Sequence, residues 1–370
     1  MSMAQRTVTA DTLRNFVLTY WILFSYFAAA AAWSPRTQVS SERSSKVFLL
    51  FGAIATALLI GTRYQVGADY RTYEFLFRVL RHASLERALS IGDPGYQFVG
   101  WIVQQMDGQV WWVNVFCAAI FISGIYRLSS TQPSPALALV VTVPYLIIVV
   151  GMGYTRQSVA LGILMLGLAS LQRGASVIRF SGYVAVAALF HKTAVLVLPL
   201  VIFASQRNRL LTIIASAAIF VLLFDLLLSD SADQLVRGYV EARYSSQGAW
   251  IRVILLLIPA FILLFNRGRF GFTQAEEKVW RFFAYASCAL PVLLIATPSS
   301  TAVDRMALYL MPLQVVLLSR AFLLFKNHKA GMGAVITFSF LVQFVWLNFA
   351  THARYWVPYR SIVFEDPYDR

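Results

Sequence analysis

Charged residues are scarce in this 370-residue chain, where Asp, Glu, Lys and Arg together make up only 13% and hydrophobic residues 59%. Soluble domains carry about 25% charged and about 45–50% apolar residues, so this composition excludes a soluble globular protein. No stretch is polar enough for a separate soluble domain, and there is no internal repeat. The sequence predicts an all-α, polytopic integral membrane protein that forms a single domain over residues 1–370.

Cysteines and nucleotide-binding motifs are also missing. Cys117 and Cys288 both lie in apolar runs, where we interpret them as small core residues that offer no disulfide framework and no metal spacing. The chain has no Walker loop, dinucleotide fingerprint, His-Glu-x-x-His motif or lipidation signal. We therefore expect no cofactor and no metal. A reaction carried out without a nucleotide needs a substrate that is already activated.

Acidic residues are outnumbered, with 17 Asp and Glu against 31 Lys and Arg, which gives a net charge of +14. The basic residues are scattered through short loops and form no Lys/Arg-rich block. This distribution favours positive-inside orientation and attraction to anionic membrane lipid over binding to nucleic acid.

Apolar runs of spanning length recur from residue 16 almost to the C-terminus, and we expect about 12 transmembrane crossings. The uninterrupted runs are 16–33, 46–61, 110–128, 136–150, 157–171, 210–228, 251–265, 279–296, 305–325 and 331–350. A further run, 180–204, contains His191 and Lys192 in its middle, which favours two short helices that meet there. The first run is long enough to span, so no cleavable signal is expected.

The segment 62–109 is long and carries charges of both signs. Residues 69–81 place arginines on one helical face and aromatic side chains on another, which predicts an amphipathic helix in the membrane interface. Gly92-Asp93-Pro94-Gly95 breaks that pattern. The run 96–106 that follows is too short to span upright, so we expect a re-entrant helix.

The loops divide into two kinds. The basic, featureless loops are 34–46, 172–179, 206–209, 266–278 and 326–329, and the positive-inside rule makes them cytoplasmic. Alternation then places 62–109, 151–156, 191–192, 229–250, 297–305 and the tail after residue 351 on the outer side. Any site built from these outer segments is expected to face away from the cytoplasm. Residues 1–15 fall outside by the same alternation although they carry Arg6 and Arg14, which leaves the placement of the N-terminus open.

Three arginines occupy positions that orientation does not require. Arg63 follows an apolar run, Arg156 precedes another, and Arg305 stands after Asp304 at the start of a third. A guanidinium presents a fixed fork to phosphate, so we expect the three to bind a pyrophosphate. The alternatives are a snorkelling interfacial side chain for Arg63 and a local ion pair or helix cap for Asp304 and Arg305.

His191 and Asp69 are the candidate catalytic residues. A histidine with a pKa near neutrality can take a proton from a hydroxyl, although an isolated histidine can equally be a hydrogen-bonded core residue. Asp69 can accept a proton or cap the helix over 69–81. The remaining residues expected to contact substrate are Asp304, Lys192, Tyr70, Tyr73 and Tyr309, the last by stacking on a sugar.

Aromatic residues return in the C-terminal tail, at Trp356 and Tyr359 on either side of Pro358. Tryptophan and tyrosine concentrate where a membrane meets water, so we expect an interface anchor here rather than a platform for sugars.

Five motifs in order resemble those of the EpsG family of membrane proteins. They are Gly61-Thr-Arg63-Tyr64 with Gly67-x-Asp69-Tyr70-x-x-Tyr73, Tyr154-Thr-Arg156-Gln157, Phe190-His191-Lys-Thr-Ala194, Asp304-Arg305 with Tyr309, and Trp356-Val-Pro358-Tyr359. The resemblance covers nearly the whole chain. It implies a Wzy-type polymerase that joins undecaprenyl-pyrophosphate-linked oligosaccharide repeats into exopolysaccharide, capsule or O-antigen at the outer face of the bacterial inner (plasma) membrane.

The expected activity is thus that of a membrane glycosyltransferase with a polyprenyl-pyrophosphate-linked donor. A chain-length regulator and a flippase are candidate partners. Two other classes remain open. One is a transporter or flippase for the same lipid-linked sugars, which predicts a continuous polar path to the cytoplasmic face. The other is a ligase or acyltransferase that acts on the glycan.

Overall fold

The computed structural model describes residues 10–33, 39–174, 176–202, 246, 248–297 and 299–364, with a few positions between 214 and 222. Every regular element in these ranges is a helix, which confirms the all-α prediction. The isolated antiparallel bridge that they contain joins Arg63 to Ser361. Most of the predicted run 210–228 and most of the predicted outer loop 229–250 lie outside the described residues.

The first half of the chain has long helices at its start and centre and short ones between them. These helices are α1 (Ala10–Trp33), α2 (Val39–Gly61), α3 (Tyr70–Val79), α4 (Leu85–Ser90), α5 (Pro94–Gln105), α6 (Val110–Ser129), α7 (Pro135–Thr142) with the π-helix Val143–Gly151 after it, and α8 (Thr155–Gln172).

The second half of the chain also contains both long and short helices. Its helices are α9 (Val177–Phe190), the 3-10 helix Lys192–Val197 that runs into α10 (Leu198–Ile202), α13 (Ala249–Phe265), α14 (Gln274–Ala296), α15 (Ser300–Leu308), α16 (Met311–Leu318), the 3-10 helix Ala321–Leu324, α17 (His328–Phe349) and the 3-10 helix Thr351–Tyr355.

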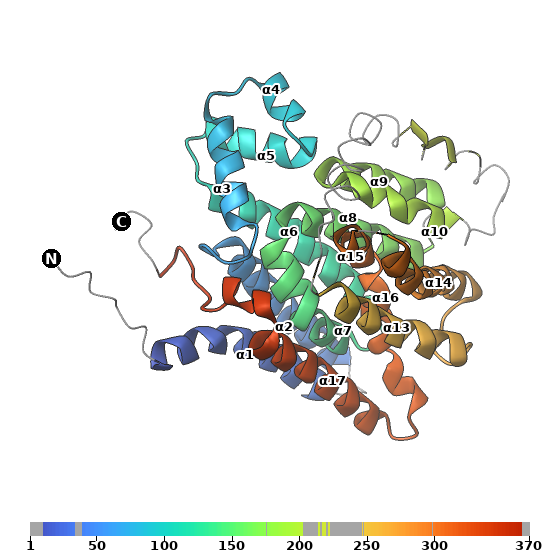
Figure 1. Ribbon diagram of the computed structural model, residues 1–370. Coiled ribbons are helices and arrows are strands. Elements are labelled where there is room, and N and C mark those ends of the chain that lie inside the picture. The colour runs from blue at the N-terminus through green and yellow to red at the C-terminus, as the bar shows by residue number, and fades with distance from the viewer. Residues whose placement is uncertain are drawn as a thin grey trace.

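Helices α6 and α8 cross at the centre of the molecule with their backbones in close approach (Figure 1). A methyl group added at Gly162 would lie 2.5 Å from the Cα of Phe121, and one added at Gly124 would lie 2.0 Å from the carbonyl oxygen of Gly162. Small residues allow this approach, which is common between helices in membranes. The crossing fixes α8, whose first turn carries Arg156.

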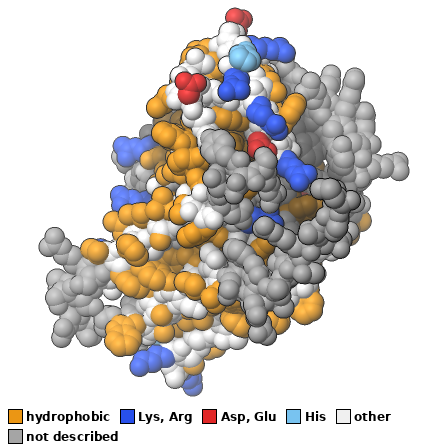
Figure 2. All heavy atoms as spheres, turned by 90° about the vertical axis from the view of Figure 1, so that its left-hand side faces the viewer, with side chains coloured by type: hydrophobic (Ala, Val, Ile, Leu, Met, Phe, Trp, Pro, Cys, Tyr) orange, Lys and Arg blue, Asp and Glu red, His pale blue; other side chains and the backbone are white. Residues whose placement is uncertain are grey.

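Helices α3, α4 and α5 form a separate group at one end of the molecule (Figure 1). In Figure 2, acidic, basic and histidine side chains gather at that end, and a broad band of hydrophobic side chains lies below it. Large apolar side chains on long helices are exposed, among them Phe51 on α2, Val292 on α14 and Leu341 on α17. An exposed apolar surface of this kind suits contact with lipid.

Three of the described helices are long and apolar enough to cross a membrane, namely α6, α14 and α17. Helices α15 and α16, which bend by 45° at their junction, count as a fourth if they form one broken span. Shorter apolar helices are Val17–Trp33, Ser45–Gly61, Pro135–Gly151, Val177–Phe190, Lys192–Val201 and Ala249–Phe265. These helices fit a membrane protein, and the number of 12 crossings stays a prediction.

The structure tests two predictions about whether an apolar run forms one helix or two. The run 180–204 is divided as expected: α9 ends at Phe190, and His191 has an extended backbone before the next helix begins at Lys192. The prediction of one continuous helix over 305–325 is wrong. The chain bends between α15 and α16, and Pro312 stands in the first turn of α16, where its missing N–H costs nothing.

The C-terminal tail does not form the expected interface anchor. Trp356 and Tyr359 are buried, with 1% and 4% of their surfaces exposed. The indole of Trp356 donates to the carbonyl oxygen of Ile148 at 2.8 Å, and the hydroxyl of Tyr359 donates to that of Leu59 at 2.8 Å. The tail therefore packs into the protein, because both polar groups find backbone acceptors there.

Candidate functional site

Glycines bring two of the sequence motifs into contact. Gly67 has a φ of +99°, and a Cβ there would lie 2.2 Å from the carbonyl oxygen of Met152. Gly153 packs so closely on the indole of Trp356 that a Cβ would lie 2.5 Å from the ring. Only glycine fits such positions. The loop after α2, the turn before α8 and the C-terminal tail are thereby held together next to Arg156.

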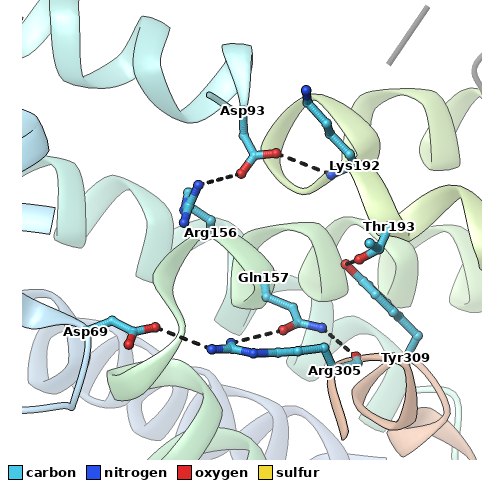
Figure 3. A network of polar contacts seen from close by, with 8 residues as sticks. All are labelled: Asp69, Asp93, Arg156, Gln157, Lys192, Thr193, Arg305 and Tyr309. Atoms are coloured by element: carbon cyan, nitrogen blue, oxygen red, sulfur yellow. Dashed lines mark hydrogen bonds and ion pairs between the residues drawn. The ribbon is translucent and has the colours of Figure 1, made fainter. Parts of the chain in front are cut away.

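Arg156 at the start of α8 forms the first half of a polar network (Figure 3). Its Nη1 lies 2.8 Å from Oδ2 of Asp93, the residue before α5, while the backbone N–H of Lys192 donates to Oδ1 of the same carboxylate at 3.3 Å. The Asp93 side chain is only 8% exposed, whereas that of Arg156 is 34% exposed. Burial raises the pKa of Asp93, and the nearby Arg156 and Lys192 oppose that rise.

Arg305 on α15 forms the second half of the network (Figure 3). Its Nη2 lies 3.6 Å from Oδ2 of Asp69, and its Nη1 donates to Oε1 of Gln157 at 3.4 Å. Gln157 donates in turn to the backbone carbonyl of Arg305 at 2.7 Å, and the guanidinium stacks on Tyr154 at 4.0 Å. Arg156 and Gln157 are consecutive residues of α8, so the two halves share one helical turn.

Asp69 does not cap α3 with its side chain. It occupies the N-cap position, but its carboxylate accepts no capping hydrogen bond and instead lies beside Arg305. Its side chain is 35% exposed. The carboxylate is thus directed at the polar network and accessible from outside the protein.

Tyr73 of α3 is a buried side chain that links the two halves. The Arg156 guanidinium lies 5.8 Å from the centre of its ring. The pKa of the Tyr73 hydroxyl is raised, mainly by burial and then by Asp69, while Arg156 and Arg305 act in the opposite direction. All three charged groups are therefore close enough to Tyr73 to influence it electrostatically.

His191 lies at the edge of the same network. Burial together with the charges of Arg156 and Arg305 lowers the pKa of His191 from 6.5 to about 3. Its ring is 6.3 Å from that of Tyr309. His191 is consequently neutral at physiological pH, and a base with this pKa has little driving force for taking a proton from a hydroxyl.

Arg63 lies beneath the network and not on its open side. Its side chain has no exposed surface and donates to the backbone oxygen of Ile60 at 2.6 Å and to Oγ1 of Thr155 at 2.7 Å. It also approaches Oδ1 of Asn114 at 3.4 Å. In this arrangement Arg63 secures the residue before Arg156, so it supports the site from within.

Asp304 pairs with a different segment from its neighbour Arg305. Its carboxylate pairs with Arg252 of α13, and Oδ2 accepts a hydrogen bond from the hydroxyl of Ser246 at 2.9 Å. Both side chains of the pair are less than 10% exposed. Asp304 therefore anchors α15 to α13 through a distant partner, and its predicted contact with substrate stays a prediction.

The other predicted contact residues lie at the margins of the site. Tyr70 is buried, with its ring edge-on to Tyr64 at 6.2 Å. Tyr309 is also buried, and its hydroxyl accepts a hydrogen bond from Thr193 at 3.3 Å. Lys192 contributes its backbone N–H, and its side chain extends away from the rest of the network in Figure 3. Their predicted contacts with substrate stay predictions.

Sequence reasoning missed Asp93 and Gln157 as members of the network. Asp93 stood inside a Gly-Asp-Pro-Gly break, where its role seemed conformational, yet it makes no capping hydrogen bond and pairs with Arg156. Gln157 follows Arg156 directly. A signal existed for Asp93, since it is the sole acid between Glu86 and Asp107, on a segment expected on the same outer side as Arg156.

The described residues contain no group of three or more His, Cys, Asp or Glu side chains placed to hold a metal ion.

Apolar helices that enclose one network of arginines, carboxylates and amides define a helical membrane protein with a polar site at one end. The chain belongs to the EpsG family, whose model matches residues 46–361. Membership of this Wzy-type polymerase-like family supports a polysaccharide polymerase-like role. No curated protein and no solved structure matches the chain.

Proposed function

We propose that this protein is a membrane glycosyltransferase that polymerises oligosaccharide repeats carried on polyprenyl pyrophosphate, at the outer face of the bacterial inner membrane. The observation that carries the proposal is the convergence of Arg156 and Arg305, from α8 and α15, on one network whose acids are Asp69 and Asp93. Both arginine side chains are partly exposed. Together they can bind the two phosphates of one pyrophosphate.

The reaction would be a displacement at the anomeric carbon of the donor sugar. The bond between that carbon and the pyrophosphate oxygen breaks, and the oxygen keeps the electron pair. A hydroxyl oxygen of the acceptor repeat forms the new glycosidic bond and loses its proton to Asp69. Arg156 and Arg305 stabilise the charge that develops on the leaving pyrophosphate, which is the kind of electrostatic term that dominates many enzymatic rate enhancements.

Asp69 is the proposed proton acceptor because of its position. Its carboxylate is 35% exposed and lies 3.6 Å from Arg305, next to the proposed leaving group. We place the neutral ring of His191 beside that of Tyr309, and we assign Arg63 to holding the first turn of α8 through Thr155.

The segments that meet at the site support an outer location. Positive-inside counting assigns 62–109, 151–156, 191–192 and 297–305 to the outer side, and residues of all four take part in the network of Figure 3. A transporter would need a polar path that continues through the molecule. The π-helix Val143–Gly151 and the adjoining α7 are instead buried and almost wholly apolar.

The experiment is to incubate purified protein in detergent with the lipid-linked repeat that accumulates in cells lacking it. A ladder of products identifies a polymerase, and a product formed only with an added acceptor identifies a ligase or acyltransferase. An intact substrate after incubation would contradict the proposal and favour a transporter. Arg156→Ala and Arg305→Ala should abolish the ladder, whereas Arg81→Ala, at an exposed position outside the site, should leave it unchanged.

A further inference from the structure

Gln97, one turn into α5, has a buried amide with no protein partner. Its side chain is 1% exposed, yet neither Nε2 nor Oε1 makes a hydrogen bond with any residue that the structure describes. Buried amides in proteins are nearly always hydrogen-bonded, since leaving them unbonded is unfavourable. An amide left open at a site thus points to a bound group that completes it.

The amide of Gln97 faces the same spot as the guanidinium of Arg156. A methyl group added at Gly92 would lie 3.4 Å from Nε2 of Gln97 and 3.9 Å from Nη1 of Arg156, with no other atom outside the adjoining residues as close. The next residue, Asp93, holds that Nη1 at 2.8 Å. Gly92, Asp93, Gln97 and Arg156 therefore surround one small space, which we call the α5 subsite.

The chemistry of the α5 subsite favours a sugar over a phosphate. An amide presents a donor and an acceptor side by side, and neighbouring hydroxyl groups of a sugar can satisfy both at once. A phosphate would use only the donor, would leave Oε1 unbonded, and would meet the carboxylate of Asp93 at short range. Arg156 also touches this space, so a sugar placed here lies beside the proposed pyrophosphate.

We propose that the α5 subsite binds the acceptor sugar, with Gln97 as its hydrogen-bonding residue and Asp93 as the positioning residue that orients Arg156. This inference rests on the proposed function, in which a second repeat must lie next to the donor. Gln97 recognises hydroxyl groups, and a methyl group at position 92 would come into contact with both its amide and Arg156.

The test uses two probes on purified wild-type and variant protein. One is the free oligosaccharide released from the lipid-linked repeat by mild acid, which keeps the acceptor hydroxyls and has no pyrophosphate. The other is inorganic pyrophosphate. The variants are Gln97→Leu, which removes the amide at similar size, and Gly92→Ala, which fills the space at an ordinary contact distance. Gln105→Leu, at an exposed position of the same helix, is the matched control.

Gln97→Leu and Gly92→Ala should each weaken oligosaccharide binding by about tenfold or more, and leave pyrophosphate binding and thermal stability unchanged. The control should bind both probes as the wild type does. Unchanged oligosaccharide affinity in both variants would overturn the subsite, and so would a parallel loss of both probes, which indicates a structural role. If the wild type forms no ladder but the two variants lose only oligosaccharide binding, the polymerase activity is refuted and the sugar subsite stands.

Discussion

At the scale of single residues, exposure separates arginines that look alike in the sequence. Arg156 and Arg305 each pair with one acid from another segment and keep 34% and 24% of their side chains exposed. Arg63 has no exposed surface, and its guanidinium donates hydrogen bonds to the carbonyl of Ile60 and the hydroxyl of Thr155. A guanidinium with all of its surface buried can position a neighbour, whereas a partly exposed one can exchange its protein partner for a ligand.

Asp69→Asn tests the proton acceptor. The amide keeps the size of the carboxylate but cannot take a proton, so we expect the turnover number to fall by about 10²–10⁴-fold. Pyrophosphate should bind at least as well, because a negative charge beside Arg305 is lost. The measurement is the rate of ladder formation, with pyrophosphate affinity determined separately. Glu74→Gln on α3, next to exposed Arg78, serves as control. Full activity in Asp69→Asn would exclude this role.

His191 should make the protein less stable in acid. Its pKa is lowered to about 3 in the folded state, so below pH 6.5 the unfolded chain takes up a proton that the folded protein does not. Stability from this group is therefore full above pH 6.5 and declines as the pH falls. Thermal unfolding of wild type and His191→Gln should show the wild type losing more stability between about pH 7 and pH 5. Equal losses would show that His191 titrates normally.

The residues of the site were only partly predictable. Arg156 and Arg305 stand out in the sequence because a charge next to an apolar run needs a partner or water, and Asp69 stands out as an acid at the start of the amphipathic segment 69–81. Asp93 and Gln97 did not, since an acid before proline and a glutamine in a short helix have ordinary local explanations. Their roles depend on α5 lying against Arg156 and the start of the 3-10 helix at Lys192, a contact between distant segments that local spacing does not encode.

At the scale of elements, the crossing of α6 and α8 holds the site in place. Gly162→Ala would bring a methyl group to 2.5 Å from the Cα of Phe121, and a backbone atom cannot move aside as a side chain can. We expect a loss of about 1–3 kcal/mol in the free energy of unfolding. Gly182→Ala is the matched control, since a Cβ there meets nothing within 4 Å on α9. Thermal unfolding in detergent measures both, and equal stability would contradict the close crossing.

Helices were predicted well where apolar runs are bounded by polar turns. α6, α13 and α17 begin and end within a few residues of the expected runs. The bend of 45° between α15 and α16 was missed, because hydropathy continues unchanged through it. Pro312, which lacks an N–H and favours the start of a helix, was the available signal.

At the scale of the whole molecule, the C-terminal tail joins the two ends of the chain. The hydroxyl of Tyr20 on α1 donates to the carbonyl oxygen of Trp356 at 2.7 Å, and the indole packs on Gly153. The sequence alone suggested a tail at the membrane interface. Tryptophan and tyrosine are common both at that interface and in protein cores, so their presence did not distinguish the two locations. Only the pairing of distant backbone groups distinguishes a buried tail from an exposed one.

Trp356→Ala should lower the free energy of unfolding by about 3–5 kcal/mol, because it empties a fully buried site and leaves the carbonyl of Ile148 without its donor. Activity should fall with the folded fraction. Trp112→Ala, at a position 45% exposed on α6, is the control and should cost much less. Unfolding of the two variants at the same temperature would show that the tail contributes little.

The pairing of the loop after α2 with the tail also bears on how the protein is made. The backbone N–H of Tyr64 bonds to the carbonyl of Arg360, and that of Gly67 to the carbonyl of Tyr355. These partners leave the ribosome almost 300 residues apart. The loop that leads to Asp69 can therefore make these contacts only after the last helix, α17, has been synthesised. Topology reporters fused to progressively shortened chains would map a protein that lacks these contacts, so insertions within the intact chain are the sounder approach.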